Sequence, residues 1–169
     1  LRDTSLSAQH VMVIKAMVGI LWSLGAAKCL PFLPVVMPLL LHTAAATEHA
    51  QYSALLRETA IEQLGHLISI MGLHVRSYLP RLLQLARENL HSSSVSLLIH
   101  TLGLIEQLCL ALCDEFGPHL PPLVPILLMI LQEDRTEKRT PSLKVLHALG
   151  IFDQHLHEHL HLIVPALLR

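Results

Sequence analysis

A short apolar and proline-rich pattern recurs four times in this 169-residue chain. Each copy carries one leucine at the same place, and these leucines are Leu33, Leu79, Leu120 and Leu160. Their separations are 46, 41 and 40 residues. A period of this length predicts stacked pairs of helices, because one such pair cannot bury its apolar face alone and several stacked pairs can.

The sequence therefore predicts an all-α fold, an α-solenoid of about four HEAT-type antiparallel helix pairs. We expect residues 1–169 to form a single solenoid fragment, with repeats near 1–50, 51–91, 92–134 and 135–169. The composition agrees, since 52% of the residues are hydrophobic, only 4% are aromatic and no alternating strand pattern is present. Solenoids of this kind usually hold other proteins, so the pattern indicates scaffolding and not catalysis.

In each predicted pair, a longer helix precedes a second helix that opens near a proline. Gly25, Gly72 and Gly117–Pro118 are expected to end the longer helices. Pro38 and Pro125 lie one turn further in and predict second helices that are kinked or start late. The apolar stripes expected to face the core are Ile14, Met17, Val18, Leu21 and Leu24; Leu56, Ala60, Leu64, Leu67, Ile68 and Met71; Leu98, Leu102, Ile105, Leu108, Cys109, Leu112 and Phe116; and Leu143, Leu146, Leu149 and Phe152.

Residues 133–139 form the one dense run of charge, which predicts a solvated surface loop; a contact with a partner is the functional alternative. Thr140 and Pro141 follow it and are predicted to be the N-cap and the first residue of the next helix. One of the serines Ser92, Ser93 and Ser94 is expected to cap the third long helix.

The sequence predicts no catalytic, cofactor-binding or metal-binding residues and no cofactor. It contains no Gly-rich phosphate loop, no Cys-x-x-Cys and no His-Glu-x-x-His. Glu62 and Glu106 sit in identical Ile-Glu-Gln-Leu tetrads, which we interpret as an echo between repeats and not as a catalytic carboxylate pair. Cys29, Cys109 and Cys113 are expected to be small buried residues in a reducing compartment.

The densest histidine group is His155 to His161, in which His155/His159 and His157/His161 would be i,i+4 pairs if the segment were one helix. Such pairs can bind a metal, which is the alternative interpretation. The group straddles the predicted turn into the last helix, so we expect solvated or capping histidines.

The net charge of −1 and the dispersed Lys and Arg residues argue against nucleic-acid binding. Residues 29–47 carry no formal charge over a length close to that of a membrane span. Pro31, Pro34 and Pro38 fit an inter-helix corner better, so no direct membrane insertion is expected. The chain does not begin with Met and shows no signal peptide, and we interpret it as an excerpt of a longer protein.

Several strings, in collinear order over nearly the whole chain, resemble the mid-region HEAT solenoid of the target-of-rapamycin (TOR) serine/threonine kinases. These strings are 10–13, 23–25, 28–29, 32–38, 63–65, 74–78, 104–108, 115–116, 120–125, 142–144 and 160–165. The Ala44–Ala46 tract and the extra histidines depart from that pattern.

The resemblance implies a structural segment of a TOR-like kinase of the phosphatidylinositol-3-kinase-related group, active in nutrient and growth signalling. Its implied partners are neighbouring HEAT repeats of the same chain, a second TOR protomer and a Raptor-type adaptor. The implied location is the cytoplasm, with recruitment to lysosomal or vacuolar membranes through partners. The kinase domain would lie outside this chain, so no catalytic residue is carried over and the fragment itself is expected not to be an enzyme.

Two other readings remain open from the sequence. A HEAT-repeat nuclear transport receptor or phosphatase scaffold would use the same architecture to grip cargo or subunits, although acidic residues are sparse for a transport receptor. A metal-binding or membrane-embedded helical protein is the alternative from a different class.

Overall fold

The computed structural model describes residues 7–45, 54–152, 156–157 and 160–167, and within these ranges every regular element is helical. The longer helices are α1 (Ser7–Leu24), α4 (Ala54–Met71), α6 (Val95–Leu112) and α8 (Thr140–Phe152). The second helices are α3 (Leu33–Ala44), α5 (Leu79–Leu90), α7 (Val124–Glu133) and α9 (Leu160–Leu167). Short connecting turns are α2 (Ala26–Cys29), η2 (Leu30–Phe32), η3 (Gly72–Tyr78) and η4 (Cys113–His119).

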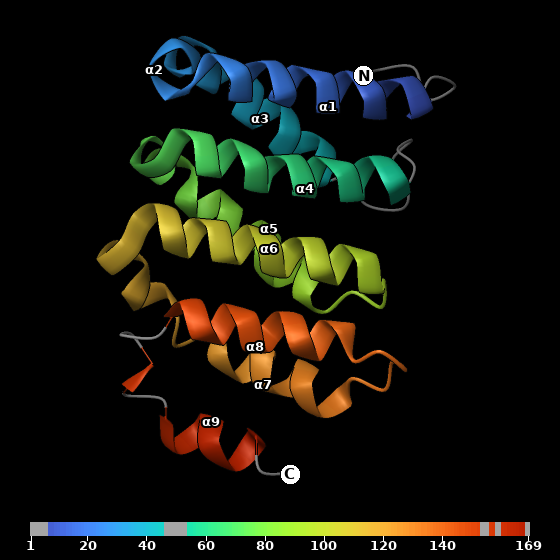
Figure 1. Cartoon of the computed structure of the whole chain (residues 1–169), viewed down its shortest axis with the longest axis vertical. Helices are drawn as coiled ribbons and strands as arrows, with labels where there is room; N and C mark the ends of the chain where they lie inside the picture. The colour runs from blue at the N-terminus through green and yellow to red at the C-terminus, as the bar shows by residue number, and fades with distance from the viewer. Residues whose placement is uncertain (1–6, 46–53, 153–155, 158–159, 168–169) are drawn as a thin grey trace.

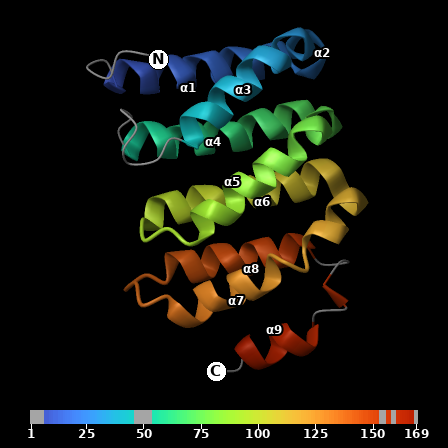
Figure 2. The ribbon, with the colours of Figure 1, turned by 180° about the vertical axis from the view of Figure 1, so that it is seen from behind.

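The helices lie in two layers. Helices α1, α4, α6 and α8 lie side by side down one face, and each contacts the next (Figure 1). Helices α3, α5, α7 and α9 form the opposite face (Figure 2). The two chain ends lie at opposite ends of the stack. The prediction of an all-α, solenoid-like fold is thus confirmed, while the exact repeat boundaries stay a prediction.

The core runs between the two layers along the whole stack. The predicted stripes of α4 and α6 are confirmed, since every residue from Leu56 to Met71 and from Leu98 to Phe116 named in them is buried. In α1, Ile14, Val18 and Leu21 are buried, but Leu24 is exposed. Long helices with a neighbour on either side in their layer therefore bury all of their predicted stripe.

The predicted stripe of α8 is wrong at two positions. Leu143 and Leu146 are 61% and 42% exposed, while Val145 and Ala148 are fully buried in their place. Apolar residues at both sets of positions offer two overlapping stripes, and periodicity alone does not choose between them. Lys144 and His147 both contact α6, and this pair of contacts orients α8 about its axis.

Prolines begin the second helices α3, α5 and α7, as predicted, whereas Pro165 lies inside α9. Pro34, Pro80 and Pro125 each occupy one of the first two positions of a helix, where the missing N–H has no intrahelical partner. Helix α7 starts late, at Val124, and Pro38 lies inside α3. Residues that precede α7 thus form a turn, whereas the corresponding residues of the second repeat are the first residues of α5.

Three long helices end at a residue with positive φ. Gly25 and Gly72 have φ of 76° and 54°, and Cys113 has φ of 48°. A Cβ at Gly25 or Gly72 would meet no atom within 4 Å, so backbone conformation and not space favours glycine there. The predicted end at Gly117–Pro118 is wrong, because α6 ends at Leu112 and those two residues lie within η4.

Cys113→Gly should stabilise the protein. Cys113 has φ 48° and ψ −124°, a combination that strains any residue with a Cβ and costs about 1–3 kcal/mol. Glycine removes that strain, but its more flexible unfolded chain lowers the stability by about 0.5–1 kcal/mol. The free energy of unfolding should therefore rise by about 1 kcal/mol in total. Chemical denaturation measures it. Cys113→Ala is the matched control, since it keeps a Cβ; an equal gain for both variants would contradict the strain argument.

Two segments, 26–44 and 95–119, are long and apolar enough to cross a membrane by length and composition. Of an 18-residue window in each segment, 39% and 56% respectively is buried within the fold. Each segment changes direction between an α-helix and a 3₁₀ turn. The buried apolar side chains of both segments form part of the helical core.

Candidate functional site

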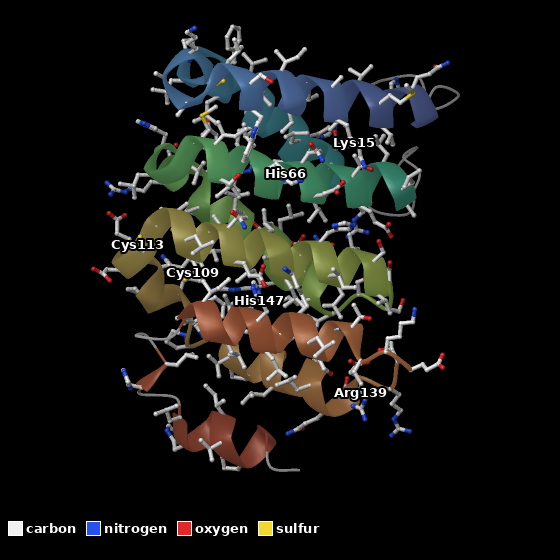
Figure 3. The ribbon with its side chains drawn as sticks, in the orientation of Figure 1. Lys15, His66, Cys109, Cys113, Arg139 and His147 are labelled. Atoms are coloured by element: carbon white, nitrogen blue, oxygen red, sulfur yellow. The ribbon has the colours of Figure 1, made fainter. Side chains whose placement is uncertain are left out.

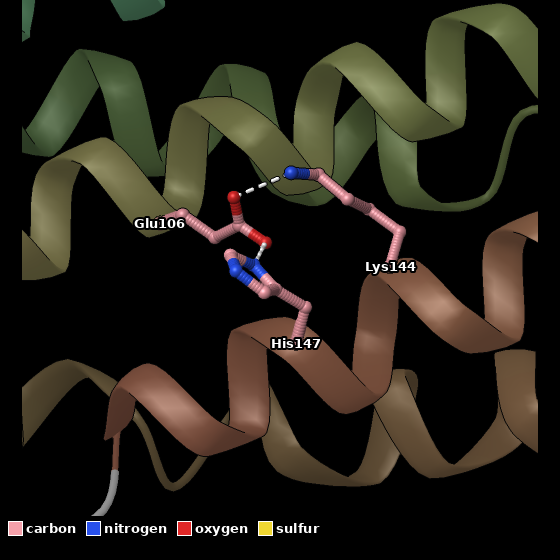
Figure 4. A network of polar contacts seen from close by, with 3 residues as sticks. All are labelled: Glu106, Lys144 and His147. Atoms are coloured by element: carbon pink, nitrogen blue, oxygen red, sulfur yellow. Dashed lines mark hydrogen bonds and ion pairs between the residues drawn. The ribbon is translucent and has the colours of Figure 1, made fainter.

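A buried glutamate joins the third and fourth long helices. Glu106 on α6 is only 3% exposed. Its Oε2 lies 2.5 Å from Lys144 Nζ and its Oε1 lies 2.8 Å from His147 Nδ1, both on α8 (Figure 4). A carboxylate out of water is tolerated only where such partners satisfy it. This network holds α6 and α8 in one register.

The second glutamate of the repeated tetrad has the same kind of role. Glu62 on α4 lies 3.3 Å from Lys15 Nζ on α1. Burial raises the pKa of Glu62, but the hydrogen bond and charge of Lys15 outweigh it, so the pKa lies below its usual range. Each tetrad glutamate thus pairs with a cation on a neighbouring long helix, which agrees with an echo between repeats.

A further polar group joins three elements at one end of α4. Arg57 donates to the Ala44 carbonyl oxygen at the end of α3 and to Asn89 Oδ1 at the end of α5. Glu58 accepts hydrogen bonds from Ser94 and Ser96 at the start of α6, at 3.0 and 2.8 Å. Ser94 is also the N-cap of α6, as predicted for this serine run, and accepts from the Leu97 N–H.

The charged run 133–139 is mostly exposed, as predicted, but Asp134 is buried. Its Oδ1 accepts from the Thr136 N–H and hydroxyl, and its Oδ2 accepts from the Ser142 N–H and hydroxyl, at 2.6–3.0 Å. The predicted N-cap at Thr140 is wrong, since α8 begins at Thr140 itself. Asp134 lies before the helix and accepts instead from one N–H of its first turn, that of Ser142.

Asp134→Asn should destabilise the protein by about 2 kcal/mol, because an amide nitrogen would face donors that now meet a carboxylate. Burial raises the pKa of Asp134, but its bonds from Ser142 and Thr136 outweigh this and lower it. Its contribution is therefore full above about pH 4, the unfolded pKa, and is lost as pH falls below it. Urea unfolding at pH 7 and pH 3 measures this.

The stability deficit of the variant should be smaller at pH 3 than at pH 7, because pH 3 lies below the unfolded pKa of the carboxyl but still above its lowered folded pKa. Glu133→Gln is the control, since Glu133 is exposed and next in sequence. A deficit equal at both pH values would exclude a role for the ionised carboxylate.

Two open grooves lie on opposite faces. One of about 470 Å³ lies over α4 and α6 and is lined by residues that include Trp22, His66 and Glu106. Lys15 and His66 lie at the boundary of α1 and α4, and His147 lies between α6 and α8 (Figure 3). The other groove, of about 530 Å³, lies beside α5.

The described cysteines and histidines do not assemble into a metal site. Cys29 and Cys109 are buried, as predicted, but Cys113 is exposed because it ends α6 at the surface. Burial, and then the nearby Cys113, raise the pKa of Cys109 to about 11. His157 and His161 are exposed, and the other members of the histidine group, His155 and His159, lie outside the described residues. Within the described ranges, no three His, Cys, Asp or Glu residues are grouped as metal ligands.

Most of the polar contacts described above therefore join one helix to another. Sequence reasoning missed Asp134 and the partners of Glu106. The identical tetrads did not reveal that Glu62 pairs with the preceding long helix and Glu106 with the following one. No arrangement among the described residues resembles a nucleophile with its base. What these residues do is to set the register of neighbouring helices.

Comparison with known proteins identifies the chain. Residues 1–72 match the family described as the serine/threonine-protein kinase mTOR domain. The whole chain is 38% identical to the serine/threonine-protein kinase TOR of Arabidopsis thaliana, and 34% identical to tor1 of Schizosaccharomyces pombe and to mTor of Drosophila melanogaster. The chain spans 7% of the length of each of these relatives and contains no kinase domain. The chain belongs, as a small segment, to the TOR family of serine/threonine kinases.

Proposed function

We propose that the chain is a HEAT-repeat scaffold segment of a TOR-like protein kinase, supporting complex assembly, dimerisation and adaptor docking in growth signalling. Its proposed partners are further HEAT repeats of the same polypeptide, a second TOR protomer and a Raptor-type adaptor, in the cytoplasm or at membranes reached through them. Matches over the whole chain favour TOR over the transport-receptor and phosphatase-scaffold alternatives.

The observation that carries the proposal is the outer face of α1. When the long helices are aligned on Gly25 and Gly72, Val13, Ile20 and Leu24 correspond to Ala60, Leu67 and Met71. The α4 residues are at most 2% exposed, whereas Val13 and Ile20 are 58% and 61% exposed.

Side chains at these helical positions are thus buried in α4, which is covered by α1, but exposed in α1 itself. Exposed apolar surface of this kind marks an interaction site. A further helix pair stacked in the same register would bury it, as solenoid repeats do.

Ile20→Asp in the whole polypeptide that contains this chain tests the proposal. We expect loss of co-purifying adaptor and of the dimer by light scattering, with kinase activity on a short peptide retained. Trp22→Asp is the matched control, because its counterpart Ser69 on α4 is exposed. Unchanged assembly in the Ile20 variant would exclude a scaffold role for this face.

A further inference from the structure

The groove beside α5 has an apolar floor and a basic rim. Its floor includes Leu79 and Leu83, which are buried except for their edges. Arg76 of η3, Arg87 and Glu88 of α5, and His119 of η4 also line it. The residues that line the groove belong to α5, η3 and η4, and α5 lies on the face formed by the second helices (Figure 2).

Two arginines of this face have no acidic partner among the described residues. Arg76 pairs with Glu115, but Arg81 and Arg87 make no hydrogen bond or ion pair with residues 7–45, 54–152, 156–157 or 160–167. Arg81 lies three residues before Gln84, which lines the groove, and so on the same side of α5. Glu88 accepts a hydrogen bond from Gln84 at 2.9 Å.

The groove on the opposite face differs in this respect. There, Glu62 pairs with Lys15, and Glu106 pairs with Lys144. Its charged groups therefore satisfy one another, and the exposed guanidiniums of α5 have no comparable partner among the described residues.

The fold itself does not require arginines at this place. Helix α3 contains no Lys, Arg, Asp or Glu, and the one such residue of α7 is Glu133 at its last position. Helix α5 packs in the same layer as these two and alone carries Arg81 and Arg87. Arg81 and Arg87 are exposed and have no polar partner among the described residues, so they are available to bind a partner protein.

We propose that this groove binds an acidic segment of a partner protein. Carboxylates of that segment would receive paired N–H donors from Arg81 and Arg87, since a guanidinium matches a carboxylate in a bidentate fork. An apolar side chain between them would rest on Leu79 and Leu83. The proposal does not depend on the TOR assignment, because it uses only the charge and shape of α5.

The test measures binding of a fluorescein-labelled synthetic peptide of alternating Glu and Leu to the whole polypeptide by fluorescence anisotropy. Arg81→Glu combined with Arg87→Glu should weaken binding roughly tenfold or more, since attraction becomes repulsion. Binding to the unsubstituted protein should also weaken between ~0.05 and ~0.3 M salt, because screening shortens the range of the attraction.

Arg135→Glu is the matched control, an exposed arginine on the loop before α8 that should leave the affinity unchanged. Thermal melts equal to that of the unsubstituted protein show that the variants fold. The proposal is overturned if a Gln-for-Glu peptide binds equally well, or if the α5 double variant binds as the control does. Tighter binding of a single-stranded oligonucleotide than of the peptide would also overturn it, in favour of a phosphate-bearing ligand.

Discussion

Leu108→Asp should unfold the chain at physiological temperature. Leu108 is fully buried in α6, the long helix that packs between α4 and α8. The substitution removes core contacts and places a carboxylate where no cation or donor is arranged to receive it. The expected loss is more than about 4 kcal/mol, which approaches the whole stability of many domains.

Circular dichroism during heating, together with size-exclusion chromatography, measures this effect. Leu110→Asp is the control on the same helix, because Leu110 is 55% exposed and should change stability by less than about 0.5 kcal/mol. A melting curve of Leu108→Asp that overlays that of Leu110→Asp would show that α6 packs on another face.

The second large effect is expected at the buried carboxylate of α6. Glu106→Ala should cost about 3 kcal/mol, because it opens a small void and leaves Lys144 without its partner at the α6–α8 interface. The side chain of Lys144 is 28% exposed, so water recovers part of its solvation and keeps the loss below that of a fully buried charge.

Glu62→Ala is the matched control, since it lies in the same Ile-Glu-Gln-Leu tetrad with a side chain that is 31% exposed. Its loss should stay below about 1 kcal/mol, as expected for an exposed ion pair. Urea unfolding of both variants, and of Lys144→Met alone and combined with Glu106→Ala, isolates the pair's coupling energy. Equal losses for the two glutamates would show that burial does not set the strength of these links.

Local sequence features predicted most of the framework. The 40-residue period, the prolines that begin α3, α5 and α7, and the stripes of α4 and α6 each depend on residues close together in the chain. Helical periodicity and backbone preference act over that same short range, so both can be predicted directly from the sequence. Gly25 and Gly72 predicted helix ends for the same reason. The helix end at Cys113 was not predicted, because its positive φ favours glycine and the residue is a cysteine.

The polar contacts between helices were harder to predict from the sequence, because the two partners of each contact lie about one repeat apart. Lys144 and His147 are 38 and 41 residues from Glu106, and Ser94 is 36 residues from Glu58. No short-range rule selects such partners, since they meet only when neighbouring helices adopt one register. The rotation of α8 is decided in the same way.

The sequence by itself determined that the chain is all-helical, how its helices alternate and which residues of α4 and α6 form the core, because period, proline and apolar spacing are local properties. The tertiary structure alone decided which carboxylates are buried and paired, which stripe of α8 faces inward, which face of α1 stays open and which arginines of α5 remain unpaired. Those properties depend on what a helix meets across the stack, and packing between distant segments sets them.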